Sequence, residues 1–464
     1  MPPNQTTLKL GPDAPFSSDP RRNPFAALDD DTPNPDFDRL IANAMDYWHT
    51  PGLSIAVIDN SRVISRGYGS AKLPLEEPVT PKTLFNCASM SKSFTSASVA
   101  LLVEDEGLKD VSWQTPVSQL CDEFVFADKA MTENVTGEDI LSHRSGLPSH
   151  DEALRSIHHK TPDTPATVTR NLRNLPFSHP LRTHYQYNNT LYTAASHLVT
   201  TLSDVPFDES LAKRFWEPLA MTRTFLGPES IPASEQRTAA QGYVWLHEKS
   251  EYHVIPHEPD PSGTGAGQIM SSVEDWARWV HAFIHHSPIL TEASYKELKT
   301  PRILAEQDVT TDYLSPWFYA LGWETSYYHG HTIVKHDGLW AGFGSVMLYI
   351  PILKWGYVMM GNSEDAGLAM VELGYQLIDQ VLRIPDEKRF NWRAYLSKDM
   401  EEGRKVASKE GLYPELAENP VAADGEKLDL ARFGGRYSNE GYHEIVLDYD
   451  AEAQYLVADC SDRT

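Results

Sequence analysis

A serine and a lysine three residues apart, Ser89 and Lys92, form a pair whose types and spacing could do chemistry. They lie in the stretch FNCASMSKSF, at the entry to a segment rich in apolar residues. On a helix this spacing is about one turn, so both side chains share a face beside the outward-pointing N–H groups of a helix start. A lysine among apolar residues has a lowered pKa and can accept or steer a serine proton. The pair therefore predicts a serine nucleophile.

The same spacing occurs a second time, in SLAK, where it joins Ser210 to Lys213. There the apolar residues Phe207, Leu211 and Phe215 mark the buried face of a helix, which leaves the serine and the lysine on its polar side. We interpret this second copy as solvated surface. The spacing by itself is therefore weak evidence for catalysis, and other segments must support it.

Two further segments carry side chains that could reach the same cleft. In YQYNNTLY, Tyr187 and Asn189 are one residue apart on an extended approach to a helix. In VKHDGLWAGFGS, His336 and Gly338 share one face of a predicted strand, and the glycine permits close approach of a substrate. Alone, one tyrosine of 21 or one histidine of 18 would be interpreted as structural. Their combination with Ser89 carries the prediction.

The combination resembles the serine β-lactamase-related family, which includes class C β-lactamases, DD-peptidases, D-aminopeptidases, family VIII carboxylesterases and acyl-transferring enzymes of fungal polyketide pathways. Residues 89–92 are similar to its S-x-x-K box, 187–189 to its Y-x-N box and 336–338 to the H-x-G form of its third box. The flanking segments ILSHRSGLPSH, FWEPLAMTRTFL and GTGAGQIMSSVEDWARW also match. The resemblance runs from about residue 37 to residue 385.

This resemblance implies a catalytic role for each matched residue. Ser89 is expected to attack an acyl carbonyl, while Tyr187, held near Lys92, exchanges the proton. The backbone N–H groups of Ser89 and Leu339 are expected to form the oxyanion hole. Water, an alcohol or an amine then takes the acyl group, and no metal or cofactor is needed.

The third box bears on the substrate. The resemblance implies that Asn189, His336 and Gly338 bind and orient it. Family members that bind a substrate carboxylate usually carry lysine in this box, whereas a histidine with a pKa near ~6.5 is mostly neutral at pH 7. Strand alternation turns Lys335 to the opposite face, and Asp337 would repel an anion. Esters, lactones or amides without a required carboxylate are therefore predicted in preference to penicillins.

We thus predict a serine hydrolase or acyl transferase of the esterase or transesterase type, acting on a small molecule through an acyl-enzyme at Ser89. Two alternatives stay open. The same site could serve a D-amino-acid peptidase, an amidase or a β-lactamase. The fold could also serve a non-catalytic assembly protein, because a fold does not fix a function.

Composition limits the partners and the compartment. The 40 basic and 65 acidic residues give a net charge of −25, which opposes binding to nucleic acid or to an anionic membrane surface. The three cysteines are too few for a disulfide framework or a zinc site and fit a reducing compartment. The sequence has no signal-like start and no apolar run of about 18 residues. We therefore expect a cytoplasmic protein.

Hydrophobic periodicity predicts the elements that position these residues. An amphipathic helix from Phe37 precedes a hairpin that turns at 59–61, and a buried helix then runs from the Ser89 segment to Gly107. Three further strands appear only late in the chain, at 331–338, 343–350 and 355–362. The sequence therefore predicts an α+β fold of the β-lactamase and penicillin-binding-protein type, the transpeptidase fold, with an antiparallel sheet flanked by helices and an inserted, mostly helical lobe.

Periodicity and composition together divide the chain into four predicted parts. We expect an extended N-terminal arm (1–35), a catalytic domain (36–395, with an α/β lobe at 36–114 plus 256–395 and a helical lobe at 115–255), a linker (396–427) and a C-terminal β-hairpin (428–464). One hairpin is hardly stable alone. The last part is therefore either a portion of an incomplete β domain or a hairpin docked on the main body.

Overall fold

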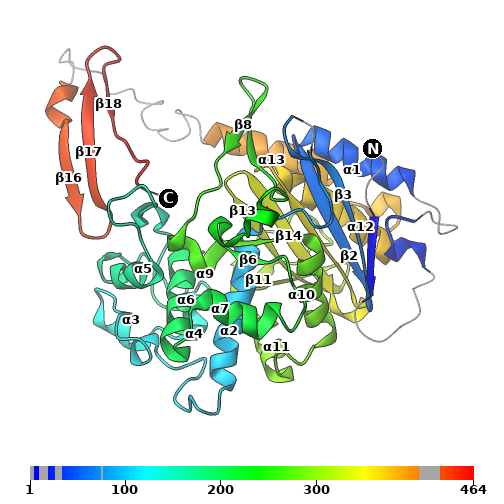
Figure 1. The fold of residues 1–464 in the computed structure, drawn as a ribbon, viewed down its shortest axis with the longest axis horizontal. Helices are drawn as coiled ribbons and strands as arrows, with labels where there is room; N and C mark the ends of the chain where they lie inside the picture. Colours follow the sequence, from blue (N-terminus) through cyan, green and yellow to red (C-terminus); the bar gives the residue numbers. More distant parts are fainter. Residues whose placement is uncertain (1–4, 10–18, 27–33, 75–76, 407–428, 464) are drawn as a thin grey trace.

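The structure, a computed structural model, describes residues 5–9, 19–26, 34–74, 77–406 and 429–463. A large antiparallel sheet with helices on both faces lies at its centre (Figure 1). The strand order is β1-β3-β2-β15-β14-β13-β12-β11-β10, and β4 pairs with β3. The strand bounds are β1 Gln5–Lys9, β2 Gly52–Asp59, β3 Arg62–Lys72, β4 Glu77–Pro78, β10 Ile303–Glu306, β11 Trp317–Tyr319, β12 Glu324–Tyr328, β13 His331–Trp340, β14 Phe343–Ile350 and β15 Trp355–Gly361.

The predicted hairpin and the late strands are confirmed. Strands β2 and β3 are joined by Asn60 and Ser61, and Asn60 takes the positive φ of 54° that such a turn needs. Strand β15 pairs directly with β2, so the sheet begun near residue 53 is completed some 300 residues later. Every residue of β2 is buried, because helices cover both faces of the sheet. Part of the predicted N-terminal arm adds the edge strand β1.

One face of the sheet is covered by α1 (Pro35–Tyr47), α12 (Ala366–Leu382) and α13 (Trp392–Val406). The predicted linker is wrong over its first residues, because 396–406 continue helix α13. Buried Trp392 and Leu396 lie one helical turn apart and pack toward α12, although the segment is otherwise highly charged. The rest of the predicted linker lies outside the described residues.

The other face carries α2 (Lys92–Glu104), α10 (Val273–His285) and α11 (Glu292–Lys299). Helix α2 is buried almost all round, as its apolar sequence predicts. It ends at Glu104, before the predicted end at Gly107, because Asp105 takes an extended conformation. No helix among the described residues is long and apolar enough to cross a membrane.

Within the predicted helical lobe, the helices of 129–216 lie beside α2, whereas residues 242–255 form strands on the other side of the molecule, where Trp245 stacks on His49 (Figure 1). The elements of the predicted lobe are η3 Val117–Gln119, α3 Lys129–Asn134, α4 Gly137–Leu141, η4 Asp151–Ala153, α5 Pro165–Asn171, η5 Leu172–Asn174, α6 Asn189–Ser203, α7 Phe207–Leu211, η6 Ala212–Trp216, β6 Phe225–Leu226, η7 Pro228–Ser230, α8 Ala233–Gln236, β7 Gly242–Leu246 and β8 Glu251–Ile255. The hairpin β7–β8 was not predicted. Short elements then lead back to the sheet: η8 Pro261–Gly263, α9 Thr264–Gly267 and β9 Ile269–Ser271.

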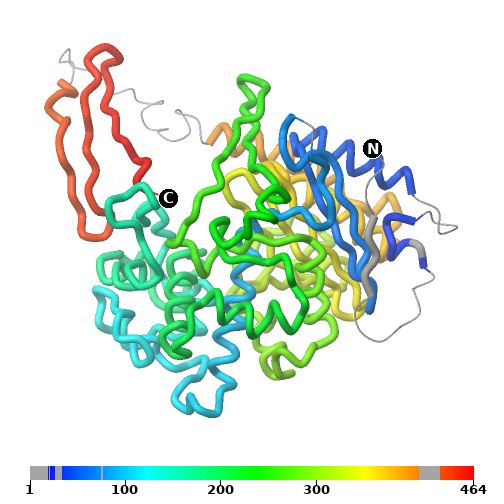
Figure 2. Tube along the Cα trace, in the orientation of Figure 1, coloured from blue at the N-terminus to red at the C-terminus, as the bar shows by residue number. Residues whose placement is uncertain are grey.

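The C-terminal part forms a separate sheet of three strands, β16 (Gly435–Asn439), β17 (His443–Asp450) and β18 (Tyr455–Val457). The predicted hairpin corresponds to β17 and β18, and β16 was missed because its short segment is polar and exposed. Figure 2 shows the end of the chain returning to the helical lobe. The segment therefore forms a three-stranded element whose end contacts the main body, and its assignment as a docked element or as a portion of a β domain stays a prediction.

Packing around α2 generates a prediction for stability. Phe94 is fully buried and its ring stacks on Trp279 with centroids 3.9 Å apart, and Trp276 meets its edge. Phe94→Ala should lower the free energy of unfolding by about 3–5 kcal/mol, because it leaves a cavity under the helix that carries Lys92. Urea denaturation followed by tryptophan fluorescence measures this change. Tyr327→Ala, at a side chain 52% exposed, should change it by less than about 0.5 kcal/mol.

Candidate active site

Ser89 lies in a 3-10 turn, η2 (Ala88–Ser91), directly before α2, and not in the α-helix itself. In a 3-10 turn, residues three apart are eclipsed, so Ser89 and Lys92 still share a face. Ala88 has a φ of +46°, a left-handed conformation that non-glycine residues rarely adopt. Such backbone strain clusters at functional sites. Here it sets the direction of the turn immediately before the serine.

The sheet approaches this turn closely at Gly338 of β13. A Cβ atom at Gly338 would lie 2.7 Å from the Cys87 carbonyl oxygen and 2.8 Å from the Ala88 Cβ atom. The Ser345 hydroxyl of β14 also donates to the Cys87 carbonyl, at 2.8 Å. Only glycine therefore allows β13 to lie against the Ser89 turn. The sequence predicted the close approach of a substrate at this glycine, whereas the neighbour seen here is the backbone of the turn itself.

Lys92 is the centre of the polar contacts. Its Nζ atom lies 3.0 Å from Ser89 Oγ, 2.8 Å from Asn189 Oδ1 and 2.9 Å from the Ala266 carbonyl oxygen. The side chain is completely buried. The structure therefore brings together two of the predicted boxes, which are about 100 residues apart in the chain.

Burial lowers the pKa of Lys92 from 10.5 to about 7, and the nearby Asp151 carboxylate acts in the opposite direction and raises it. A neutral amine has two N–H groups and one lone pair. The Ala266 carbonyl can only accept, and Asn189 Oδ1 is also an acceptor, so these two groups use both N–H groups. The lone pair is then left for the Ser89 hydroxyl. This arrangement can remove a proton from Ser89.

Tyr187 lies over the same amine, with Lys92 Nζ 4.7 Å from the centre of its ring. Burial raises the pKa of Tyr187 well above 10, and a hydrogen bond with Ser89 lowers it in part. The phenol is therefore protonated at neutral pH. His143 packs on the ring at 4.3 Å and accepts a hydrogen bond from the Asn188 N–H at 3.0 Å. This packing fixes the position of Tyr187.

Asn189 begins helix α6, for which the Asn188 side chain is the N-cap. Its amide is oriented at both ends. The oxygen accepts from Lys92, and the Nδ2 group donates to Asp151 Oδ2 at 3.1 Å. A line of contacts therefore runs from Asp151 through Asn189 and Lys92 to Ser89.

His336 is almost completely buried, and both of its ring nitrogens have partners. Nδ1 lies 2.5 Å from the Asp337 carbonyl oxygen and must donate to it, which leaves Nε2 to accept from the Tyr319 hydroxyl at 2.9 Å. Burial lowers the pKa of His336 to about 4, so the ring is neutral at pH 7. Through Tyr319, His336 contributes to the aromatic cluster that surrounds Tyr187.

Lys335 and Asp337 lie on the opposite face of β13, as strand alternation predicted. Lys335 Nζ forms ion pairs with Asp337 at 3.1 Å and with Glu324 of the adjacent strand at 3.0 Å. Burial raises the pKa of Glu324 to about 7. Lys335 is therefore ion-paired on the face of the sheet opposite Ser89 and does not place a positive charge near the serine.

Among the described residues, two groups of three side chains could present ligand atoms to a metal ion: Cys121 with Glu123 and His197, and Glu324 with His336 and Asp337. In the second group Lys335 pairs with both carboxylates. In the first, Arg170 donates to Glu123 at 3.0 Å. A cation of the protein therefore already neutralises carboxylates in each group. All three cysteines are free thiols.

A cavity of about 620 Å³ opens beside these residues and is lined in part by Asn189, Ala266 and Leu339. The Leu339 side chain is 63% exposed, so this strand end faces the opening. The ionisable lining is mostly acidic, with Arg463 as its arginine and with the carboxyl groups of Asp151, Glu258, Asp260 and Glu364. Burial lowers the pKa of the lining residue His257 to about 4. The cavity therefore disfavours anions.

The second S-x-x-K copy lies on the surface, where exposed Lys213 pairs with Glu209 at 3.0 Å. Sequence reasoning missed Asp151, His143 and Tyr319. The first two lie in or next to the matched segment ILSHRSGLPSH, which could have pointed to them. Tyr319 had no such signal.

Comparisons with known proteins agree with this geometry. Residues 37–381 match the family described as Beta-lactamase. The chain is 36% identical to the unguisins hydrolase ungD' of Aspergillus campestris over 440 residues, covering 92% of this chain and 80% of the relative. It is also 36% identical to the unguisins hydrolase ungD of Aspergillus violaceofuscus over 465 residues, with 92% and 81% covered.

The fold is similar to that of the octameric penicillin-binding protein homologue from Pyrococcus abyssi, with a TM-score of 0.65 and 22% identity. The match covers 91% of this chain and 89% of the other. At this identity the likeness concerns the fold, and the family rests on the sequence matches. By these matches, the chain belongs to the beta-lactamase family and is a serine hydrolase of that family.

Proposed function

We propose that the protein hydrolyses or transfers a small-molecule acyl group through an acyl-enzyme on Ser89. The observation that carries this proposal is the buried amine of Lys92, with two acceptors on its N–H groups and Ser89 Oγ 3.0 Å away. A desolvated amine next to a hydroxyl is the arrangement that activates a serine nucleophile. The hydrolase names of the relatives favour this proposal over a non-catalytic assembly protein.

In the acylation step, Ser89 Oγ forms a bond to the acyl carbon while its proton passes to the Lys92 amine. The carbonyl becomes an oxyanion, which the backbone N–H groups of Ser89 and Leu339 would hold. When the oxyanion collapses, the bond to the leaving group breaks, and the Tyr187 phenol, which is protonated at neutral pH, can supply the proton. Lys92 then returns a proton to Tyr187.

Deacylation reverses these roles. Water, or an alcohol or amine acceptor, gives its proton to the base and attacks the acyl carbon, which frees Ser89. Asn189 holds Lys92 in place during both steps, and Gly338 lets β13 lie directly against the serine turn. His336 acts at a distance, through the Tyr319 hydroxyl.

For the acyl donor we propose an ester, lactone or amide without a required carboxylate. His336 is neutral, Lys335 is paired behind the sheet, and the cavity presents mostly acidic side chains. The names of the two fungal relatives make unguisins specific candidate substrates to test beside simple esters.

The first prediction concerns the nucleophile. Incubation with a fluorophosphonate should add one covalent label to Ser89, detected by intact-mass and peptide mass spectrometry. Ser89→Ala should remove both the label and ester turnover, because the attacking oxygen is lost. Ser210→Ala, in the surface copy of the motif, is the matched control and should keep both. An unlabelled wild type, or a label that survives in Ser89→Ala, would contradict the proposal.

The second prediction concerns pH. Below about pH 7 Lys92 is protonated and cannot accept the Ser89 proton, so kcat/KM for a p-nitrophenyl ester should rise as pH increases through about 7. Asp151→Asn removes a negative charge that raises the Lys92 pKa, so the rising limb should move to lower pH. Glu248→Gln, on an exposed turn, should leave the limb in place. A limb that moves upward in Asp151→Asn would be the wrong sign.

The third prediction concerns substrate charge. p-Nitrophenyl butyrate and mono-p-nitrophenyl succinate have acyl groups of nearly equal size, and only the second carries a carboxylate. After correction for their hydroxide-catalysed rates, kcat/KM should be at least about tenfold higher for the butyrate, since the acidic cavity repels the anion. A preference for the succinate would instead favour the carboxylate-binding peptidases and β-lactamases of the family.

A further inference from the structure

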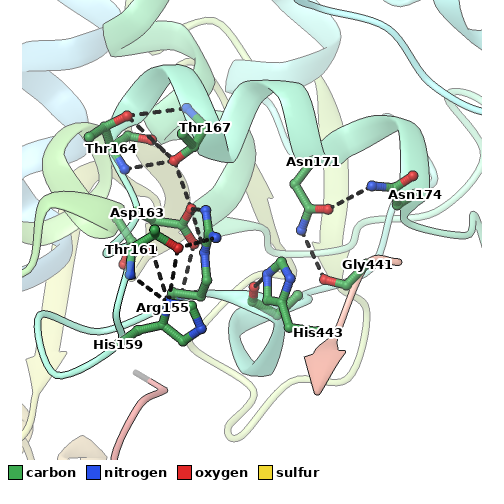
Figure 3. Close-up of polar contacts among 12 residues, drawn as sticks. Arg155, His159, Thr161, Asp163, Thr164, Thr167, Asn171, Asn174, Gly441 and His443 are labelled. Carbon is green, nitrogen blue, oxygen red and sulfur yellow. Dashed lines mark hydrogen bonds and ion pairs between the residues drawn. The ribbon is translucent and has the colours of Figure 1, made fainter. Parts of the chain in front are cut away.

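The C-terminal sheet is bound to the helical lobe by specific polar contacts, several of which appear in Figure 3. The Asn171 side-chain amide donates to the Gly441 carbonyl at 2.9 Å, and the His443 ring donates to the Ala153 carbonyl at 3.1 Å. A Cβ atom at Gly441 would lie 2.9 Å from the Asn174 carbonyl oxygen. The two surfaces are therefore in close contact, with no room for a side chain at Gly441.

The residues after β18 bind the loop that follows η4. The backbone N–H of Ser156 donates to the Asp462 carbonyl at 3.0 Å, and its hydroxyl donates to the Ser461 carbonyl at 2.9 Å. Arg155 and Arg463 form a β-bridge between the two segments. The Arg463 guanidinium in turn donates to the Tyr442 carbonyl at 2.7 Å, so the tail is tied back to the sheet.

On the lobe side, the same loop is held by Arg155. Its guanidinium forms an ion pair with Asp163 at 2.6 Å, and its backbone N–H donates to the same carboxylate at 2.8 Å (Figure 3). Thr167 also donates to Asp163, at 2.7 Å. The loop is thus anchored to α5 on one side and to the C-terminal tail on the other.

Together with η4 this loop forms the segment 150–163, which begins next to the catalytic contacts. The Tyr442 hydroxyl, from the C-terminal part, hydrogen-bonds Nδ1 of buried His150, and His150 Nε2 donates to the Pro176 carbonyl at 3.1 Å. A carbonyl can only accept, so Nδ1 is the acceptor and Tyr442 is the donor. The next residue is Asp151, which accepts from Asn189. Tyr442 thus binds the residue that directly precedes Asp151, where the line of contacts to Ser89 begins.

The tail also forms part of the cavity wall. Ser461 and Arg463 line the same cavity as Asn189, Ala266 and Leu339. The Arg463 side chain is only 14% exposed, and its N–H groups are directed at the carbonyls of the C-terminal sheet. The Arg463 side chain therefore contributes to the shape of the cavity wall, while its N–H groups donate to backbone carbonyls of the protein.

We infer that the C-terminal segment 435–463 is a structural part of the active site. Its tail forms one wall of the substrate cavity. Tyr442 holds the 150–163 loop at His150, and Arg463 fixes the tail that binds Ser156, so that Asp151 stays against Asn189. Tyr442 and Arg463 are positioning residues in this inference, which rests on the proposed function of Ser89. A segment that is merely docked would contribute to stability and leave the chemistry unchanged.

The test uses the full chain with Tyr442→Phe and Arg463→Ala. Each should lower kcat/KM for p-nitrophenyl esters by roughly 2- to 12-fold, the range for one hydrogen bond. Each should also move the rising limb of the pH profile to lower pH, in the same direction as Asp151→Asn, because Asp151 would lie farther from Lys92. Arg436→Ala, at an exposed ion pair on the same sheet, is the matched control and should change neither.

A double-mutant cycle separates positioning from general destabilisation. In the Asp151→Asn background, Tyr442→Phe should give no further shift of the pH limb, because the charge through which it acts is already gone. The inference would be overturned if Tyr442→Phe shifted the pH limb equally in both backgrounds. It would also be overturned if the limb did not move in Tyr442→Phe and Arg463→Ala. In either case the role of Ser89 would stand as long as Ser89→Ala loses the label and the activity that wild type shows.

Hydrogen–deuterium exchange gives a readout that does not depend on activity. Gly441→Val should force the C-terminal sheet away from the Asn174 backbone, and the backbone N–H of Ser156, which donates to Asp462, should then exchange faster, while those of α10 do not change. The fluorophosphonate adduct on Ser89 should still form if the main body stays folded. Unchanged exchange in 150–163 would overturn the inference. Loss of the adduct from wild type would instead overturn the proposed function.

Discussion

The chemistry of this protein depends on one physical constraint: the Lys92 amine must be buried away from water. Bulk solvent would keep a lysine charged at neutral pH, and a charged amine has no lone pair for a serine proton. The buried helix α2 keeps the amine dry, and two acceptors orient it. Desolvating an amine opposes folding, so the surrounding core must compensate. The apolar packing of α2 is therefore a condition for catalysis as much as for stability.

The fold satisfies this condition by bringing together segments that are distant in sequence. Ser89 and Lys92 come from the junction of η2 and α2, Asn189 from the start of α6 in the helical lobe, and Gly338 from β13. The sheet can receive β13 beside η2 because β15 completes it next to β2. The late strands therefore contribute to the site, since the end of β13 lines the cavity beside Ser89.

Local patterns predicted the fold class, the hairpin, the late strands and the matched boxes, because each is encoded within about ten residues. The contacts of Asp151 and Tyr319 could not be predicted, because they join residues that only tertiary packing brings together. The charged composition of 396–406 concealed helix α13, whose stability comes from Trp392 and Leu396 against α12. Strand β16 is polar and exposed, so it has no apolar alternation to detect.

The dry environment also links reactivity to specificity. Ala266 contacts the Lys92 amine and also lines the cavity, so a change at this position would affect both the pKa of the amine and the choice of substrate. In this chain the wall is built partly from the lobe loop and partly from the C-terminal tail, which are tied together by the hydrogen bonds of Ser156 to Ser461 and Asp462. Variation in either segment could therefore alter the choice of substrate without touching Ser89.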